Sequence, residues 1–122
     1  MTQDTLRSAA AELLAPATDK TLVSETNLAG RYRRLDLGIR NAGANPVTAA
    51  ALKTGVGSAR VTDPSRSAAL LAALSAGGSY ALTLTDDDVP DALEIDLTSA
   101  SGTTLAVYLL GTQHSTTTVA QD

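Results

Sequence analysis

The sequence predicts a mainly β domain whose strands are antiparallel. Four segments alternate apolar and polar residues with the period of a half-buried strand, at residues 35–39, 80–84, 93–97 and 105–109. Groups of Asn, Asp, Gly, Pro and Ser separate these segments, and such groups are typical of turns. With 122 residues, the chain is long enough for one domain and too short for two.

Residues 1–30 are expected to form an N-terminal arm. The run TLRSAAAELLA at 5–15 predicts a short helix, because Ala and Leu favour helices and Pro16 ends the run. Residues 16–30 show no period and are expected to form an extended connection. The apolar stripe of the helix can pack on the chain's own sheet or on another subunit, and the sequence favours neither. Its members are Leu6, Ala9, Ala10, Leu13 and Leu14.

The β-rich part is expected to run from residue 31 to residue 111. Its first strand, at 35–39, ends in an Asn- and Gly-containing turn at 41–46. A second strand is expected at 47–54, although its many Ala residues are poor strand formers. A short edge strand around Val61 follows.

A second helix is predicted at 65–75, with Ser65 or Ser67 as its cap and two glycines after its end. The last three strands then follow with clear alternation, and Ser99–Gly102 indicates a hairpin turn between the final two. A β-meander is the simplest arrangement of these three strands.

The predicted core is thin. The chain holds 22 Ala and 18 Leu but only 7 Val and 2 Ile, with no Trp and no Phe, so few large side chains can be buried. Cysteine is absent, which excludes stabilisation by disulfides. Small domains with weak cores often rely on neighbouring subunits, and we therefore expect a homo-oligomer.

The charge is distributed unevenly along the chain. Residues 1–64 hold eight basic and six acidic side chains, whereas residues 65–122 hold one basic and seven acidic side chains. The net charge of −4 and the scarcity of aromatic residues argue against nucleic acid as a partner. No apolar stretch is long enough to cross a membrane, and the N-terminus lacks the pattern of a signal peptide. We expect neither nucleic acid nor membrane as a partner.

Residue types suited to catalysis are scarce. His114 is the only histidine and lies in the polar segment 112–122, which is expected to be a C-terminal tail or a strap along a partner. Neither G-x-S-x-G nor H-E-x-x-H occurs, and no phosphate-binding glycine motif occurs either. The sequence therefore predicts no enzyme, no catalytic residue and no cofactor.

One group of acidic residues is a weak candidate binding site for a hard cation. Calcium, for example, takes six to eight oxygen ligands. It contains Asp86, Asp88 and Asp91. The group lacks the D-x-D-x-D-G loop, and nearby Glu94 and Asp96 fall on the outer face of a predicted strand. A solvated edge is the plainer interpretation, and we expect no metal site.

Three segments resemble a small β-sandwich module that recurs in tailed-phage virion proteins. They are RRLDLGIRNAGANPV at 33–47, LSAGGSYALTL at 74–84 and SGTTLAVYLLGT at 101–112. The resemblance implies a single antiparallel, jelly-roll-like β-sandwich, to which the residue pattern adds a short N-terminal helix and one short internal helix. Such modules bring no catalytic residues with them.

The module is most similar to head decoration, or cement, proteins. This resemblance implies a structural virion protein that is made in the host cytoplasm and stabilises the outer capsid surface. Its partners would be the major capsid protein or another virion protein, and a trimer is the favoured oligomer. The expected partner contacts are Leu6, Leu13, Leu14, Arg31, Arg33 and His114.

Two other functions remain open. A phage tail or neck adaptor would share the same features. A host-surface spike module that binds carbohydrate would use the loops at 41–46, 55–60 and 86–91. The few aromatic residues argue against sugar binding, because sugars usually stack on aromatic faces.

Overall fold

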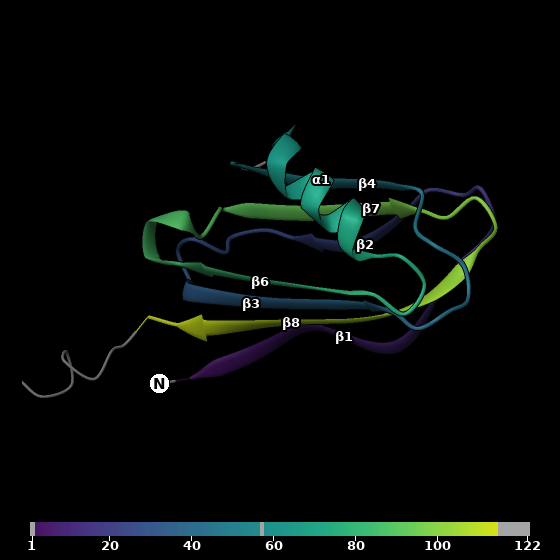
Figure 1. Ribbon diagram of the computed structural model, residues 1–122. Helices are drawn as coiled ribbons and strands as arrows, with labels where there is room; N and C mark the ends of the chain where they lie inside the picture. Colours follow the sequence, from purple (N-terminus) through teal and green to yellow (C-terminus); the bar gives the residue numbers. More distant parts are fainter. Residues whose placement is uncertain (1, 57, 115–122) are drawn as a thin grey trace, which may run out of the picture.

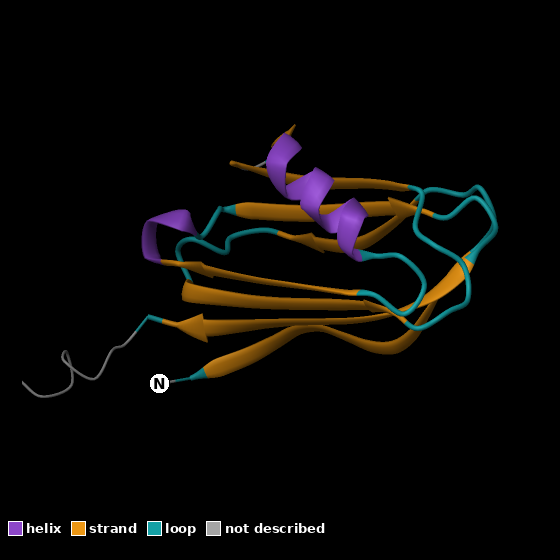
Figure 2. Ribbon diagram, viewed as in Figure 1, coloured by secondary structure: helices purple, strands orange, loops and turns teal. Residues whose placement is uncertain are grey.

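The computed structural model describes residues 2–56 and 58–114, which form two antiparallel sheets and, among these residues, one α-helix (Figures 1 and 2). The strands are β1 (Gln3–Leu14), β2 (Lys20–Glu25), β3 (Tyr32–Asn41), β4 (Ala49–Val56), β5 (Ala59–Thr62), β6 (Ser79–Thr85), β7 (Ala92–Thr98) and β8 (Thr103–Gln113). The helix is α1 (Pro64–Ala73), and a 3-10 turn, η1 (Asp86–Asp88), precedes β7.

The two sheets have four strands each and face one another. Sheet A has the order β1-β8-β3-β6, and sheet B has the order β2-β7-β4-β5. The first strand pairs with the last, the second with the second last, and so on inwards to the β4–β5 hairpin. The chain is therefore one long hairpin folded over itself, and it is held in two sheets by the further pairs β8–β3 and β7–β4.

The core lies between the sheets and is almost entirely aliphatic. Residues opposite one another in a ladder point to the same face, so the alternating residues of β3, β7 and β8 fill the interior. Tyr32 is the aromatic residue that is fully buried within the described part of the chain. The leucine, isoleucine and valine side chains that these three strands bury in the core are Leu35, Leu37, Ile39, Leu93, Ile95, Leu97, Leu105, Val107 and Leu109.

The prediction of a helix at residues 5–15 is wrong, because this segment is strand β1 at the edge of sheet A. Helix propensity is a weak preference, and pairing along β8 overrides it here. Two register shifts, between Thr5 and Arg7 and between Ala9 and Glu12, break the strict alternation of β1. An apolar spacing that looks helical in the sequence is thereby accommodated in a strand.

The sheets also begin earlier than expected. Strand β2 occupies Lys20–Glu25, within the stretch expected to be an extended connection, and it forms an edge of sheet B. The paired region thus runs from Gln3 to Gln113 and includes most of the segment expected to be an arm. The expected tail or strap at 112–122 lies outside the described residues from Ser115 onwards.

The internal helix is confirmed at Pro64–Ala73, but Asp63 caps it instead of Ser65 or Ser67. The Asp63 carboxylate accepts a hydrogen bond from the Arg66 amide, and Pro64 occupies the first turn. Ser67 is used differently, since its hydroxyl oxygen accepts from the Leu52 amide at 2.8 Å and so docks α1 on β4. The helix covers the side of the sandwich between β4 and β6 (Figure 1).

The expected β-meander of the last three strands is wrong. Strands β6 and β8 lie in sheet A on either side of β3, while β7 lies in sheet B. Ser99–Gly102 therefore connects the two sheets instead of forming a hairpin. Alternation shows which residues of a strand point inwards, but it does not show which sheet the strand joins.

Two glycines in neighbouring strands of sheet A provide a test of this packing. A Cβ on Gly111 would lie 2.7 Å from the buried Tyr32 ring, whereas a Cβ on Gly38 would have no neighbour within 4 Å. We expect Gly111→Ala to lower the free energy of unfolding by about 1–3 kcal/mol. We expect Gly38→Ala to leave it unchanged or to raise it by up to about 1 kcal/mol. Urea denaturation of both variants measures the difference, and equal effects would contradict the packing of Tyr32 on Gly111.

Candidate functional site

The outer faces of the two sheets differ in character. Charged pairs cross the outer face of sheet B: Arg60 lies 2.7 Å from Glu94, and Lys53 lies 3.0 Å from Asp96. The Thr21 hydroxyl also donates to Asp96 at 2.6 Å. The polar groups on this face therefore largely satisfy one another.

Asp96 shows how tightly this network is built. Burial alone would raise the pKa of its carboxyl group, but the Thr21 hydroxyl, Glu94 and the Lys53 ammonium together hold that pKa below its ordinary value. Asp96 is therefore ionised at neutral pH and pairs with the cation beside it. The outer face of sheet B around β4 and β7 is therefore polar, and its charges are paired within the sheet.

The outer face of sheet A instead carries a shallow hollow of about 300 Å³. It crosses β3, β6 and β8 because Gly38 lies opposite Ala81 on one side and Tyr108 on the other. Two residues further along β3, on the same face, Arg40 lies opposite Ser79 and Ala106; we call each such set of paired residues a row. The lining residues are Gly38, Ile39, Arg40, Ser79, Tyr80, Ala81, Ala106 and Tyr108.

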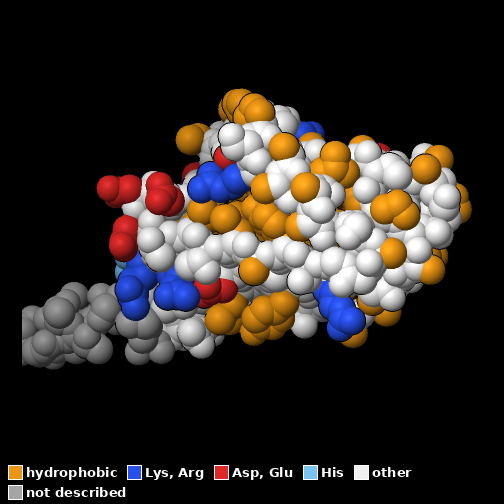
Figure 3. All heavy atoms as spheres, viewed as in Figure 1, with side chains coloured by type: hydrophobic (Ala, Val, Ile, Leu, Met, Phe, Trp, Pro, Cys, Tyr) orange, Lys and Arg blue, Asp and Glu red, His pale blue; other side chains and the backbone are white. Residues whose placement is uncertain are grey.

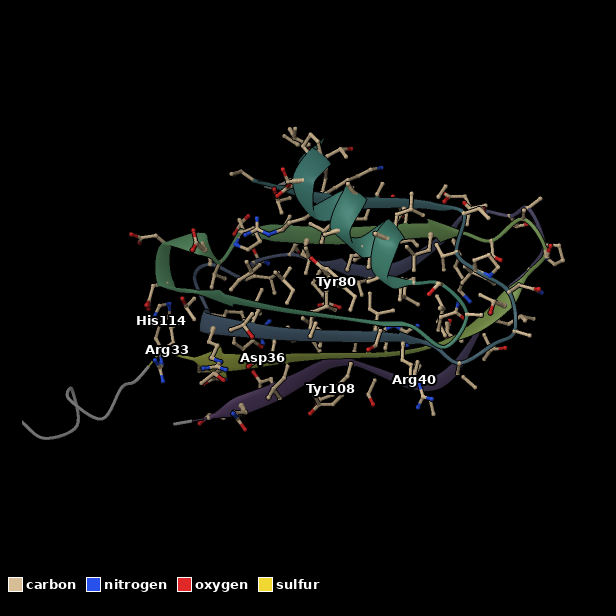
Figure 4. All side chains as sticks on the ribbon, in the orientation of Figure 1. Arg33, Asp36, Arg40, Tyr80, Tyr108 and His114 are labelled. Atoms are coloured by element: carbon tan, nitrogen blue, oxygen red, sulfur yellow. The ribbon has the colours of Figure 1, made fainter. Side chains whose placement is uncertain are left out.

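Tyr108 and Arg40 stand out from this face. Tyr108 is 45% exposed, although a tyrosine ring can bury a large apolar area against a partner. Figure 4 shows both side chains pointing away from the sheet, on the side opposite sheet B. In the space-filling view, apolar side chains gather along the lower edge of the molecule between groups of charged ones (Figure 3).

A charged pair lies one row beyond Gly38 on the same face. Arg34 Nε lies 2.9 Å from Asp36 Oδ2, and the Thr83 hydroxyl donates to Asp36 Oδ1 at 2.8 Å. The Arg34 guanidinium, aided by Thr83, holds the pKa of Asp36 below its ordinary value although burial opposes this. The hollow therefore has a carboxylate near one end and the Arg40 guanidinium at the other.

A second polar cluster joins the ends of β1, β3 and β8. The Asp4 carboxylate accepts hydrogen bonds from the Tyr32 hydroxyl at 2.7 Å and from Gln113 Nε2 at 2.9 Å, and Arg31 lies 3.6 Å away. The Tyr32 hydrogen bond is the main reason that the pKa of Asp4 is lowered. Burial, together with this hydrogen bond to Asp4, raises the pKa of Tyr32. This cluster fastens the first strand to the core.

The structure brings two of the expected partner contacts, Arg31 and His114, together at this end of sheet A. The His114 amide donates to the Arg31 carbonyl at 3.3 Å, and its ring Nε2 lies 3.3 Å from the Ala29 carbonyl oxygen. The Arg31 guanidinium lies 4.9 Å from the centre of the Tyr32 ring. Arg33 is half-buried in β3.

The three expected leucine contacts do not share one exposed face. Leu14 is fully buried in the core, and Leu6 packs against that core while partly exposed. Leu13 is 65% exposed and lies opposite Thr104, on the outer face of sheet A. Only Leu13 of the three is thus placed for contact with a partner.

The acidic residues considered for a cation lie at the turn before β7. Asp86 and Asp88 belong to η1 and are exposed, and Asp91 follows it half-buried. Among residues 2–56 and 58–114, no three acidic or histidine side chains are grouped so that they could hold a metal ion. These residues also contain no helix long and apolar enough to span a membrane.

Comparison with known proteins adds no relative. The chain matches no protein-family model, and neither a curated protein nor a solved structure matches it. No site residue can therefore be transferred from another protein, and the candidate site depends on geometry alone.

Sequence reasoning missed the hollow at Gly38, Arg40 and Tyr108. One signal was present, because Gly38 interrupts an otherwise regular strand pattern, and a strand glycine often marks a close approach. The pairing of β3 with both β6 and β8, which brings the lining residues together, involves sequence separations too large for local patterns to reveal.

The Asp4 cluster predicts a pH dependence of stability. A carboxyl group whose pKa is lowered in the folded state stabilises the fold above its unfolded pKa, and this contribution is lost as the pH falls through the folded value. We expect Asp4→Asn to lower the melting temperature at pH 7, and we expect the difference from wild type to shrink below a pH of about 4. Calorimetry of both proteins between pH 7 and a pH below about 4 measures this difference in melting temperature. A difference that stays constant with pH would contradict the role of the charge.

Proposed function

We propose that the chain is a structural virion protein of a tailed phage that decorates the outer capsid surface and stabilises the head. The strand order supports this proposal, since pairing of first with last strand across two four-stranded sheets is the jelly-roll arrangement common in viral capsid proteins. The resemblance of residues 33–47, 74–84 and 101–112 to phage virion modules supports it independently.

The observation that carries the proposal is the contrast between the two outer faces. The outer face of sheet B satisfies its charges internally, and the exposed Val56 and Val61 of this sheet belong to the β4–β5 hairpin. The outer face of sheet A instead carries the hollow, with the exposed Tyr108 in its lining. An exposed apolar patch with a polar rim is typical of a surface that another molecule covers. Sheet A is therefore the face that would meet the major capsid protein or another virion protein.

Docking through the face is favoured over strand addition at an edge. Glu12 of β1 lies 2.7 Å from Lys20 of β2 and 3.2 Å from Arg7, and Arg7 Nε donates to the Leu22 carbonyl. These contacts tie the two neighbouring edge strands together. Charged side chains along an edge also discourage pairing with another chain.

The thin core supports assembly into a homo-oligomer, with a trimer favoured. Its large buried side chains are leucines and isoleucines with Tyr32 as the aromatic member among the described residues. A fold with so little aromatic burial gains stability whenever a neighbour covers further apolar surface. Contact with a capsid lattice and with other copies would provide such cover.

A spike module that binds carbohydrate is the second candidate, and the exposed Tyr108 beside the hollow favours it. The three loops expected for this role do not form one surface. The ladder of β4 with β7 places residues 55–56, 58–60 and 86–91 at one end of the sandwich, whereas 41–46 lies at the other. A sugar site on this fold would instead lie on sheet A. A neck or tail adaptor remains a third candidate.

Immunogold electron microscopy of virions produced from the genome that encodes the chain tests the location. We expect antibody against the purified protein to label capsids on their outer surface. Label confined to the tail or neck would favour the adaptor, and virions without label would contradict the proposal.

A variant identifies the docking face. We expect Tyr108→Glu to reduce the amount of protein bound to capsids at least tenfold, because it places a charge in the apolar patch. Val61→Glu on sheet B is the matched control, since Val61 is also an exposed apolar residue, at 70% exposure, and it should bind normally. Quantitative gel densitometry of purified particles measures both, and equal losses would contradict docking through sheet A.

A further inference from the structure

No contact or backbone conformation within the chain requires a glycine at position 38. A glycine in the interior of a strand costs roughly 0.5–1 kcal/mol relative to Ala, so a reason is expected. At Gly111 a Cβ would strike the Tyr32 ring, and at Gly55 it would strike the Ala59 backbone. At Gly38 a Cβ would have no neighbour within 4 Å, and the backbone does not require positive φ. The space above Gly38 is therefore open to a molecule outside the chain.

The floor and wall of this space suit one flat ring. Gly38 backbone and the methyl groups of Ala81 and Ala106 form a smooth floor, and the exposed Tyr108 ring rises beside it. The volume of about 300 Å³ is at the lower limit of small-molecule pockets, so it accommodates a single ring or a short chain of rings. Aliphatic C–H groups of such a ring can pack on the tyrosine face.

The rim of the hollow is polar on both sides along β3. Arg40 and the Ser79 hydroxyl lie on one row, and Asp36 and the Thr83 hydroxyl lie on the other side of Gly38. Asp36 is already paired with Arg34, but Arg40 forms no ion pair with any residue in the described ranges 2–56 and 58–114. A guanidinium with free donors binds a carboxylate through two parallel hydrogen bonds.

We propose that the hollow at Gly38 is a binding site for an acidic saccharide, a pyranose ring that carries a carboxylate. The ring lies over Gly38 against Tyr108, the carboxylate binds Arg40, and a ring hydroxyl reaches Ser79. This site goes beyond the decoration function and does not depend on it, because the isolated chain would bind the saccharide. On a capsid, saccharide and capsid protein would compete for the face that carries Tyr108.

A second copy of the chain fits the hollow less well. A two-fold axis perpendicular to the strands, in the plane of the interface, would place Gly38 over Gly38 of the other copy. The two hollows would then face each other and leave a void with no packing contacts. A two-fold axis along the strands would bring Arg40 close to Arg40 of the other copy. Both arrangements carry a penalty that a carboxylated ring avoids.

Titration of the isotope-labelled full chain by nuclear magnetic resonance tests the proposal. The probes are methyl glycosides of glucuronic acid, galacturonic acid and N-acetylneuraminic acid, with methyl glucoside as the neutral comparison. We expect at least one acidic glycoside to shift the amide signals around Gly38, Arg40, Ser79 and Tyr108. Its affinity should exceed that of methyl glucoside about tenfold, because the carboxylate adds charged hydrogen bonds.

Three variants separate the parts of the site. Arg40→Gln should reduce the affinity for the acidic glycoside to that for methyl glucoside, and Tyr108→Ala should weaken both at least tenfold. Gly38→Val should abolish binding while leaving the fold intact, since its side chain fills the open hollow. Gly30→Val is the matched control, because Gly30 also has open space around its Cβ position, and it should bind as wild type does.

Three results would overturn the proposal. The first is the absence of shifts around Gly38 with every acidic glycoside at tens of millimolar, and the second is undiminished binding by Gly38→Val. The third combines two observations: wild type binds no saccharide, and sedimentation shows a lower oligomeric state for Gly38→Val than for wild type. This result would assign the hollow to a contact between protein chains. Because capsids are absent from these experiments, failure here leaves the decoration function to its own test.

Discussion

The pairing of β1 with β8 is the contact on which the rest of the structure depends. It completes sheet A beside β8, whose inward residues Leu105, Val107 and Leu109 lie at the centre of the core. It also brings Asp4 to the hydroxyl of Tyr32, the large aromatic side chain in the core. In a core built mainly of leucine, loss of this strand would expose several buried groups together, each worth roughly 1.5–3 kcal/mol.

The same folding pattern separates the two outer faces. Because strands paired with one another share a face, the charged residues of β4 and β7 meet across sheet B, and the small residues of β3, β6 and β8 meet across sheet A. Sheet B therefore completes its own ion pairs, while sheet A is left with a shallow apolar surface between Asp36 and Arg40. Each proposed interaction of the protein is assigned to sheet A for this reason.

Local sequence pattern predicted the parts of the fold that depend on nearest neighbours. The alternation around Leu35, Leu82, Ile95 and Val107 identified strands, and the composition at 65–75 identified the helix. It failed at β1, where Ala and Leu favour a helix but long-range pairing and two register shifts decide the structure. It also could not assign strands to sheets, and so it could not bring Gly38, Arg40 and Tyr108 together. Of the residues expected to contact a partner, Arg31 and His114 lie side by side, whereas Leu14 belongs to the core.

Native-state hydrogen exchange tests the central claim, that the first strand is an integral part of the sandwich. The amides of β1 that donate to β8 should exchange with opening free energies close to those of the amides in β3, since one cooperative unit contains both. Rapid exchange throughout β1, with β3 and β8 still protected, would show that β1 is a detachable arm and would contradict this account.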